Sequence, residues 1–502
     1  MSTLLIAYII VHVLELACWL PPLWRWRRVL LPLIGVLIVG SIVVLGFYSQ
    51  SFGVALLAIV ALYRLVNVAR ILAGRMQPDY LKRTTWRTTL ILLLITVGIA
   101  LFALLFREIN VTAGEFWNVF LFLQLGIAIA LLLSTLHHAY HMRPPRITNH
   151  LPDKDLPTLT VAIPARNETE DLQQNLKSLV ASDYPKLEIL VLDDCSTIKR
   201  TPEIIRSFAQ DGVRFIMGEP TKEGWLAKNQ AYQRLLEEAN GDLILFCGAD
   251  VRFEPQTLRN IVLLMLDKKK SMMSIMPRNI LPRFLQLDAS LIQPMRYAWE
   301  IALPRKMFKR PPVLSTCWVA KRDFLLSAGG LSAVTRSIVP ESYFARHAVR
   351  HDGYGFRYTN QEIGLTSHKA ISDQRDTATR TKYPQLHRRP ELVMILTIGE
   401  LFGLVMPFMF LIAGVVFPEI KTLLVVSAST CALLITWYLT VCSITYRQPD
   451  LRSMLSLPFA ALLDVALLNY SMLKYEFSVV LWKDRNVCVP VMRVEAKLPK
   501  LS

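Results

Sequence analysis

The chain has 502 residues, 53% of them hydrophobic, and its 56 Lys and Arg against 39 Asp and Glu give a formal net charge of +17. This composition excludes a disordered or fibrous chain and argues against an ordinary soluble enzyme. Because the positive charge accompanies an apolar excess, it indicates an anionic membrane surface or an anionic substrate as partner, and no nucleic acid. Seven cysteines without a C-x-x-C pair favour neither a disulfide scaffold nor a zinc site.

Apolar residues gather in eight long runs, each close to the ~20 residues that a helix needs to cross a bilayer. The runs are residues 3–20, 29–47, 51–73, 89–106, 117–136, 392–417, 422–443 and 455–473. They predict three parts of the chain: an N-terminal transmembrane region of about five spans at 1–142, a soluble domain at 143–391, and a C-terminal transmembrane region of two to three spans plus a tail at 392–502.

Basic residues follow the first and third runs, at 25–28 and 70–87, whereas the loops at 48–50 and 107–116 are poor in Lys and Arg. By the positive-inside rule the basic loops are cytoplasmic. We therefore expect a multi-pass protein of the cell membrane whose soluble domain lies in the cytoplasm. The eighth run does not fit this count, because a full crossing would place the basic tail outside; a re-entrant or interfacial segment, or a miscounted span, is expected there.

The soluble domain alternates between strand and helix patterns. Short buried-strand patterns stand at 159–163, 187–192 and 242–246, and a helix pattern stands at 170–181. This alternation predicts an α/β fold with a mainly parallel sheet and right-handed crossovers, whose ligands bind at the carboxyl ends of the strands. The sequence contains no G-x-G-x-x-G and no Walker lysine loop, which disfavours dinucleotide redox chemistry and ATP hydrolysis.

Four short motifs stand near the predicted strand ends and helix starts. They are Ile163-Pro-Ala-Arg-Asn-Glu168, Asp193-Asp194-Cys-Ser196, Gly224-Trp-Leu-Ala-Lys-Asn229 and Gly248-Ala-Asp250. In this order and spacing they resemble the successive motifs of family 2 glycosyltransferases, and the flanking apolar runs are similar to the membrane-integral branch of that family. The resemblance covers about 159–350 and implies a GT-A-like, Rossmann-type domain with hexosyltransferase activity.

The resemblance also implies a binding site for a UDP- or GDP-sugar. Ala165, Glu168, Asp193 and Asp194 would hold the nucleoside, since carboxylates at strand ends accept hydrogen bonds from base N–H groups and ribose hydroxyls. Lys228 would face the phosphates as a point charge. A plain turn at the two aspartates and a solvated helix position for the lysine are the alternatives.

Asp250 is the candidate metal ligand. The family usually has Asp-x-Asp, whose carboxylates hold a hard divalent cation beside the diphosphate. Here Gly248 stands at the first position. A single carboxylate still suffices for Mg²⁺ or Mn²⁺ when substrate phosphates and waters complete the coordination shell, so a single-carboxylate site is expected.

Glu341 is the candidate catalytic base. An inverting transfer needs a group that takes the proton from the acceptor hydroxyl. Glu341 stands five residues before Arg346, where the family has its acid, although Pro340 replaces a customary Glu. A helix-capping or salt-bridge role is the alternative for Glu341, and Asp352 would then become the candidate base.

Arg375 and Arg380 lie shortly before the sixth apolar run and are possible contacts to the acceptor or the diphosphate. A juxtamembrane basic cluster explains them nearly as well. Processive members of the family carry Gln-x-x-Arg-Trp near this position, and this chain has no such tryptophan motif.

Charge divides the soluble domain. Residues 151–260 carry 13 basic and 18 acidic side chains, whereas residues 261–391 carry 22 and 10. The basic half suits contact with anionic lipid headgroups, although part of it can be ordinary solvated surface. The stretch 280–303 mixes apolar residues with Arg283 and Arg296 and predicts an interfacial amphipathic helix.

Taken together, these features predict a membrane-bound inverting glycosyltransferase that moves a sugar from a nucleotide donor to a lipid or lipid-linked acceptor. One alternative is a processive polysaccharide synthase, which the missing Gln-x-x-Arg-Trp disfavours. The other is a non-catalytic membrane protein that keeps the glycosyltransferase fold, which Gly248 and Pro340 leave open.

Overall fold

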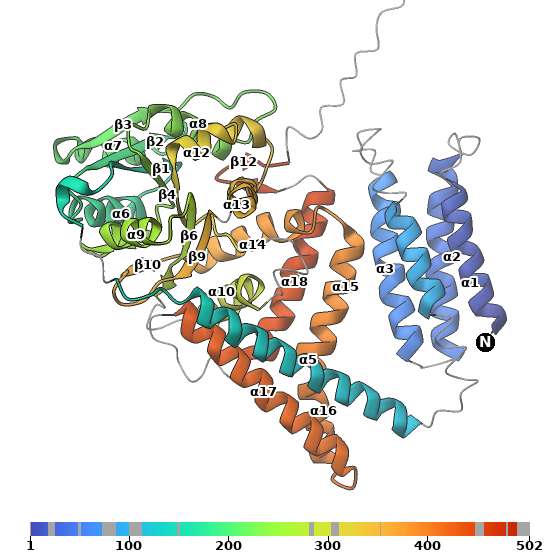
Figure 1. Ribbon diagram of the computed structural model, residues 1–502. Helices are drawn as coiled ribbons and strands as arrows, with labels where there is room; N and C mark the ends of the chain where they lie inside the picture. The colour runs from blue at the N-terminus through green and yellow to red at the C-terminus, as the bar shows by residue number, and fades with distance from the viewer. Residues whose placement is uncertain are drawn as a thin grey trace, which may run out of the picture.

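The computed structural model describes residues 2–18, 26–48, 52–72, 87–99, 113–147, 151–280, 286–302, 311–351, 353–446, 456–477 and 480–488. Asp352, the second half of the fourth apolar run and most of the basic loops used in the topology prediction lie outside these described residues. The described chain forms a sheet domain with two sets of long helices beside it (Figure 1).

The sheet domain is built on seven strands in the order β3-β2-β1-β4-β8-β6-β9. All neighbours pair in parallel except β8, which is antiparallel to both β4 and β6. The predicted strands at 159–163, 187–192 and 242–246 are β1, β2 and β4. The strands are β1 (Leu159–Ala165), β2 (Leu187–Asp193), β3 (Val213–Met217), β4 (Leu243–Cys247), β6 (Met272–Met276), β8 (Cys317–Lys321) and β9 (Tyr354–Tyr358).

Helices cover both faces of this sheet, which explains why the central strands are apolar along their whole length. On one face pack α6 (Glu170–Val180), which is the predicted helix at 170–181, α7 (Arg200–Ser207) and α9 (Thr257–Asp267). On the other face pack α8 (Ala227–Glu238), α12 (Arg322–Ser327) and α13 (Glu341–Arg350). Trp318 on β8 is fully buried and stacks on Phe246 of β4 and Phe344 of α13, so the second core fixes α13 over the sheet.

A second, three-stranded sheet joins segments that are distant in the sequence. Its strands β5 (Val251–Phe253), β10 (Leu365–Ser367) and β7 (Arg278–Asn279) lie in the order β5-β10-β7. The pairing of Ser367 with Val251 brings the chain after β10 next to the end of the Gly248–Asp250 motif.

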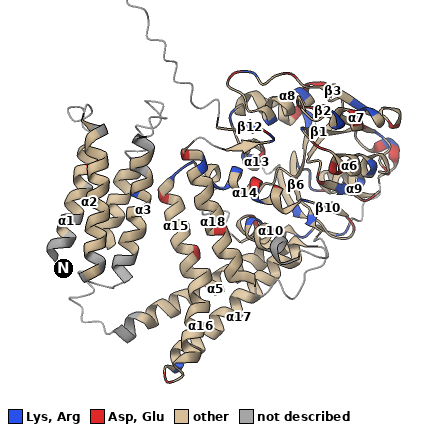
Figure 2. Cartoon of the chain, turned by 180° about the vertical axis from the view of Figure 1, so that it is seen from behind, with Lys and Arg blue, Asp and Glu red and all other residues tan. Residues whose placement is uncertain are grey.

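All eight predicted apolar runs coincide with helices in the described ranges. Four helices are long and apolar enough to cross a membrane, one before the sheet domain and three after it: Trp117–Met142, Pro390–Val416, Lys421–Thr445 and Leu457–Glu476. Three shorter apolar helices precede them. The elements are α1 (Ser2–Ala17), α2 (Arg27–Tyr48), α3 (Phe52–Leu72), a helix at Arg87–Ile99, α5 (Ala113–Met142), α15 (Pro390–Glu400), a π-helical turn at Leu401–Val405, α16 (Met406–Val416), α17 (Lys421–Thr445) and α18 (Leu457–Glu476). Figure 2 shows these helices almost free of charged residues, which gather on the sheet domain.

Two further helices, α10 (Gln286–Ile301) and α14 (Ile371–Gln385), lie between the sheet domain and α18 (Figure 1). The helix expected at 280–303 is therefore present as α10, and its apolar side packs against α17 and α18. Together α10 and α14 form a layer that both ends of α18 contact. Leu457, at the start of α18, packs in one cluster with Met295 of α10. Near its other end, the Tyr475 hydroxyl donates to the Arg380 carbonyl of α14 at 2.7 Å.

A buried ion pair fixes the layer to the helices. Lys382 Nζ of α14 lies 2.5 Å from Asp464 Oδ1 of α18, and the two side chains are 9% and 1% exposed. Arg64 of α3 and Glu15 of α1 form a second buried pair in the N-terminal helices. Each of these ions needs its partner, because an unpaired buried charge costs several kcal/mol.

Removing Asp464 should therefore destabilise the protein strongly. We expect Asp464→Ala to lower the free energy of unfolding by about 3–5 kcal/mol, because it leaves the Lys382 ammonium buried without its carboxylate. Thermal unfolding in detergent measures this loss.

The matched control is Glu203→Ala, which removes the acid of an exposed pair with Arg200 and should change stability by less than about 1 kcal/mol. Equal unfolding temperatures for the two variants would contradict a structural role of the Lys382–Asp464 pair.

Candidate active site

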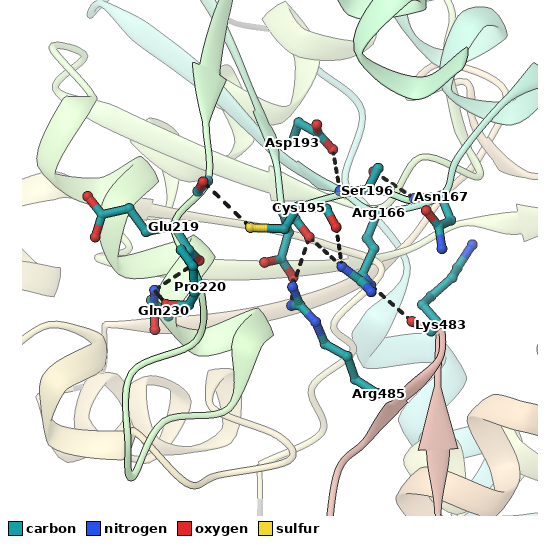
Figure 3. A network of polar contacts seen from close by, with 12 residues as sticks. Arg166, Asn167, Asp193, Cys195, Ser196, Glu219, Pro220, Gln230, Lys483 and Arg485 are labelled. Atoms are coloured by element: carbon teal, nitrogen blue, oxygen red, sulfur yellow. Dashed lines mark hydrogen bonds and ion pairs between the residues drawn. The ribbon is translucent and has the colours of Figure 1, made fainter. Parts of the chain in front are cut away.

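The first two motifs meet where β1 and β2 end. The backbone N–H of Asp194 donates to the Ala165 carbonyl at 2.8 Å. The Arg166 guanidinium donates to the carbonyls of Asp194 and Cys195 at 2.8 and 2.5 Å, and the Asn167 N–H donates to the Ser196 hydroxyl (Figure 3). The two loops therefore form one unit at the carboxyl edge of the sheet, as the parallel register predicts.

The two aspartates of this unit are buried, Glu168 is half-buried, and each of the three carboxylates has a donor. Asp193 Oδ1 accepts a hydrogen bond from the Ser196 N–H at 3.2 Å, and Asp194 Oδ2 accepts one from Arg485 Nη1 at 2.7 Å. Burial raises the pKa of Asp194, and the Arg485 guanidinium opposes this effect. Burial likewise raises the pKa of Glu168, which forms an ion pair with Lys483 at 3.1 Å.

Lys483 and Arg485 come from a hairpin near the end of the chain, made of β11 (Leu481–Trp482) and β12 (Arg485–Asn486). Its two turn residues, Lys483 and Asp484, have φ of 47° and 65°, which fits the type I′ turn common in two-residue hairpins. The Lys483 carbonyl also accepts a hydrogen bond from Arg166 Nε at 2.9 Å. The hairpin thus lies on the first two motifs, 291 positions away from Asp194 in the sequence.

The third motif and the candidate base also meet. Lys228 Nζ lies 3.8 Å from Glu341 Oε2 and 5.0 Å from the centre of the Tyr232 ring. Glu341 begins α13 and is 1% exposed, and its Oε2 accepts no hydrogen bond from the described residues. Of the two alternative roles for Glu341, the structure contains the salt bridge, with Lys228. It contains no helix cap of this kind, because α13 has no side-chain hydrogen bond at its N-cap.

Asn229 explains why the third motif stands beside Glu341. Its Nδ2 donates to the carbonyls of Val334, Thr335 and Ser337 at 2.8–3.0 Å, and the Leu226 N–H also donates to the Thr335 carbonyl. The start of α8 therefore holds the loop that leads into α13.

Lys228 and Glu341 line a cavity of about 490 Å³. This volume lies in the range of small-molecule sites, ~300–1,000 Å³. The cavity is lined by the third motif, by two segments of the sheet domain, by the hairpin, and by α10 and α14, the two helices between the sheet domain and α18. The lining residues are 221–229, Arg296, 313–315, 336–339, Glu341, Arg380, Thr381, Gln385, Trp482 and 485–487.

Basic side chains outnumber carboxylates in the wall of this cavity. Burial lowers the pKa of Lys228, and it lowers the pKa of Arg380 to about 10, with the charge of Arg296 acting in the same direction. The Arg380 guanidinium also lies 4.8 Å from the centre of the Trp482 ring. Such a cluster in a partly enclosed cavity attracts an anionic ligand.

Asp250 lies at the end of β4, where its Oδ2 accepts a hydrogen bond from the Ser367 hydroxyl at 2.8 Å. A Cβ at position 248 would come within 2.5 Å of Asp250 Oδ1, so Gly248 leaves room for this carboxylate. Nearby, burial lowers the pKa of Lys369 to about 8, which the Asp250 charge opposes.

These residues can offer a divalent cation one carboxylate ligand. No three His, Cys, Asp or Glu side chains in the described ranges gather into a metal cluster. A cation there would take most of its oxygen ligands from phosphates and water, which fits the preference of Mg²⁺ and Mn²⁺ for oxygen.

Several of the predicted site residues therefore line two cavities that adjoin each other. Lys228, Glu341 and Arg380 share the large cavity, whereas Asp194 lines an adjoining cavity of about 90 Å³ with Lys222 and Trp225, which belong to both. Arg375 instead is mostly exposed and pairs with Asp376 at 3.6 Å.

Sequence reasoning did not assign four residues of this region to the site: Lys369, Trp482, Arg485, and Arg296, which it placed only on the amphipathic helix expected at 280–303. The hairpin has no Asn-Gly or Asp-Gly turn signal, so its charged residues resemble a basic tail. Arg296 and Lys369 stand in no motif, and only the crossing of α10, α14 and β10 brings them to the site.

Comparison with known proteins gives matches to part of the sheet domain. A model of Glycosyl transferase family 2 matches residues 160–325. Probable glycosyltransferase YdaM of Bacillus subtilis (strain 168) is 31% identical over 192 residues, covering 35% of this chain and 43% of that protein. The 4,4'-diaponeurosporenoate glycosyltransferase of Staphylococcus aureus (strain USA300) is 30% identical over 223 residues, covering 42% and 54%. The chain matches about half the length of these relatives.

Among solved structures, the mannosyltransferase PcManGT from Pyrobaculum calidifontis, in complex with GDP-Man and Mn²⁺, covers 70% of this chain and 98% of that chain at 18% identity, with a TM-score of 0.37. The family match includes all four motifs, and the predicted α/β fold with a mainly parallel sheet is confirmed.

Proposed function

Because a model of Glycosyl transferase family 2 matches residues 160–325, we propose that the chain is a membrane-bound inverting glycosyltransferase of the hexosyltransferase type. It would move a sugar from a UDP- or GDP-sugar to a lipid or lipid-linked acceptor. The observation that carries this proposal is the meeting of Lys228, Glu341 and Arg380 in one cavity, beside the carboxylates of the first two motifs.

The donor would lie along the carboxyl edge of the sheet. Ala165, Glu168, Asp193 and Asp194 would hold its nucleoside, as the family resemblance implies. Asp194 is now bonded to Arg485, so a ribose or base N–H that uses the same oxygen would replace this ion pair. Donor binding would therefore loosen the hairpin from the first two motifs.

The transfer itself would need one base and stabilisation of one leaving group. Glu341 would take the proton from the acceptor hydroxyl, whose oxygen then attacks the anomeric carbon while the bond from that carbon to the diphosphate oxygen breaks. Lys228 and Arg380 would stabilise the charge that develops on the leaving nucleoside diphosphate. Lys228 would exchange its partner Glu341 for the phosphates, which would free the carboxylate to act as a base.

Asp250 would contribute a ligand to Mg²⁺ or Mn²⁺ beside the diphosphate. The ion would supply charge neutralisation at the leaving group. Ser367 would orient the Asp250 carboxylate through its hydrogen bond.

The acceptor would come from the membrane. The four long apolar helices and the basic half of the sheet domain support this part of the proposal. One relative is named for a lipid-like acceptor, 4,4'-diaponeurosporenoate. We further propose a multi-pass protein with the sheet domain in the cytoplasm, in which α18 lies at the membrane interface, because both of its ends contact elements next to the sheet domain.

If Asp194 and Lys228 bind the donor, removing the charge of either side chain should weaken nucleotide binding. Asp194→Asn or Lys228→Ala should lower the affinity for UDP or GDP by about tenfold or more, because a charge-assisted contact contributes roughly 1.5–3 kcal/mol. Isothermal calorimetry on the full chain in detergent measures this. Wild-type affinity in both variants would remove these residues from the site, with the exposed Glu203→Ala as control.

The metal site predicts dependence on a divalent cation. EDTA should abolish transfer, Mg²⁺ or Mn²⁺ should restore it, and Asp250→Ala should stay inactive after the ion is returned, since its only carboxylate ligand is gone. Transfer of labelled sugar to membrane lipids is the measurement. Full activity in chelator would show that this site works without a metal.

The catalytic base predicts a loss of rate without a loss of binding. Glu341→Gln keeps the shape of the side chain and removes its basicity, so transfer should fall by about 10²–10⁴-fold while the nucleotide affinity hardly changes. Turnover per folded molecule and thermal stability are measured on the same sample.

A purely structural role of Glu341 predicts the reverse pattern: lower thermal stability with turnover nearly intact. A Gln variant that is as stable as the wild type and transfers sugar at the same rate would remove Glu341 as the base.

A further inference from the structure

The Gly248–Asp250 motif forms a tight turn whose carbonyl groups all accept hydrogen bonds. The Val251 N–H donates to the Gly248 carbonyl at 3.3 Å, which closes a β-turn with Asp250 at its third position. The Asp250 carbonyl accepts a hydrogen bond from the His368 N–H at 2.9 Å. The other carbonyls of the turn are bonded by two side chains, one from α6 and one from β5.

Asn175 of α6 is the first of these side chains. It is fully buried, and its Nδ2 donates to the carbonyl of Val251 at 2.7 Å and to that of Gly248 at 3.4 Å. Because only the amino group of an amide can donate to two carbonyls, these contacts determine how the side chain is oriented. One buried side chain therefore spans the turn from its first residue to its last.

Arg252, which follows the turn on β5, is the second. Its Nη1 donates to the carbonyls of Ala249 at 2.8 Å and Val251 at 3.0 Å, and its Nη2 donates to Asp171 Oδ1 at 2.8 Å. Asp171 and Asn175 stand four positions apart on α6 and therefore lie on the same face of that helix. This face of α6 fixes the turn directly through Asn175 and indirectly through Arg252.

Fixing the turn matters because Asp250 is the only carboxylate of the motif. A second carboxylate would limit where an ion can lie, whereas a single one must itself be held in place by its surroundings. Ser367 donates to Asp250 Oδ2, so Oδ1, beside Gly248, is the oxygen left for an ion. We propose that Asn175 and Arg252 are positioning residues of the metal site, which hold the Asp250 carboxylate in one direction and replace the orienting effect of the missing acid.

This inference rests on the proposed binding of Mg²⁺ or Mn²⁺ at Asp250 and adds two residues that act on the ion through the backbone of the turn. Removing a group that orients a metal ligand typically lowers metal affinity by about 10–100-fold. A merely structural role of Asn175 or Arg252 would instead lower thermal stability and leave the metal affinity of the folded protein unchanged.

The first experiment measures Mn²⁺ binding directly. The full chain in detergent is saturated with UDP or GDP and titrated with Mn²⁺. Free Mn²⁺ is followed by its electron paramagnetic resonance signal, corrected for the Mn²⁺ that the nucleotide binds alone. Asn175→Ala should weaken Mn²⁺ binding by about 10–100-fold, because both ends of the turn lose a donor.

The matched control is Asn260→Ala. Asn260 of α9 also donates from its Nδ2 to a loop carbonyl, that of Glu362, but it lies outside the motif, so this variant should bind Mn²⁺ as the wild type does. If Asn175→Ala binds Mn²⁺ as tightly as the wild type, the inference is overturned and the proposed function stands. If the wild type with bound nucleotide binds no Mn²⁺, both the proposed metal site and this inference are overturned.

The second experiment uses the sign of a charge and does not depend on a variant of the buried Asn175. Arg252→Met removes a positive charge from beside the proposed cation site, so the change in charge alone would strengthen Mn²⁺ binding. Losing the bonds to two carbonyls should weaken it instead, and we expect an affinity about tenfold lower in the same titration. Unchanged or tighter binding by the folded variant, as checked by thermal unfolding, would overturn the positioning role of Arg252.

Rescue by the ion separates a misplaced ligand from a lost one. In the transfer assay, Asn175→Ala should need more Mn²⁺ than the wild type but recover most of its kcat at saturating Mn²⁺, because the Asp250 carboxylate is still present. Asp250→Ala should not recover. A kcat for Asn175→Ala that stays as low as that of Asp250→Ala at saturating Mn²⁺ would contradict a positioning role.

Discussion

The parallel register of β1, β2 and β4 is the constraint on which the site depends. Because Ala165 lies opposite Asp193 and both strands end there, two polar loops must share one edge of the sheet. Burial on both faces fixes this register, since a slip would expose continuous apolar strands. The adjoining end of β4 carries Asp250, and α8 and α13 add Lys228 and Glu341 from one covering layer.

At that edge, charges of opposite sign hold each other in partly dry surroundings. Burial raises the pKa of Glu168 and Asp194 and lowers that of Lys228, so each charged form depends on its partner. A charged ligand can exchange these partners for its own groups, because part of the desolvation cost of the side chains has already been met in the folded protein. The ion pairs between the hairpin and the motifs are therefore suited to open and close around a ligand.

The layer of α10, α14 and α18 connects this edge to the helices. The Lys382–Asp464 pair fixes α14 on α18, and Arg380, two positions earlier on α14, lines the large cavity. The same helix therefore carries a structural cation toward the bundle and a second cation toward the site. Its close packing makes the geometry of the site dependent on the apolar helices beside it.

The sequence by itself determined the local features: the strands and the first helix of the domain, the eight apolar helices, and the motifs with Asp194, Lys228, Asp250 and Glu341. The strand, helix and span signals are periodicities that the chain carries within a few residues, whereas the site residues were expected from the resemblance of short motifs to a known family. The tertiary structure alone brought Arg485 to Asp194 and Arg296 to the wall beside Arg380, and turned Arg375 outward. Contacts between segments that lie far apart in the sequence depend on how helices cross and pack, and no local pattern encodes that crossing.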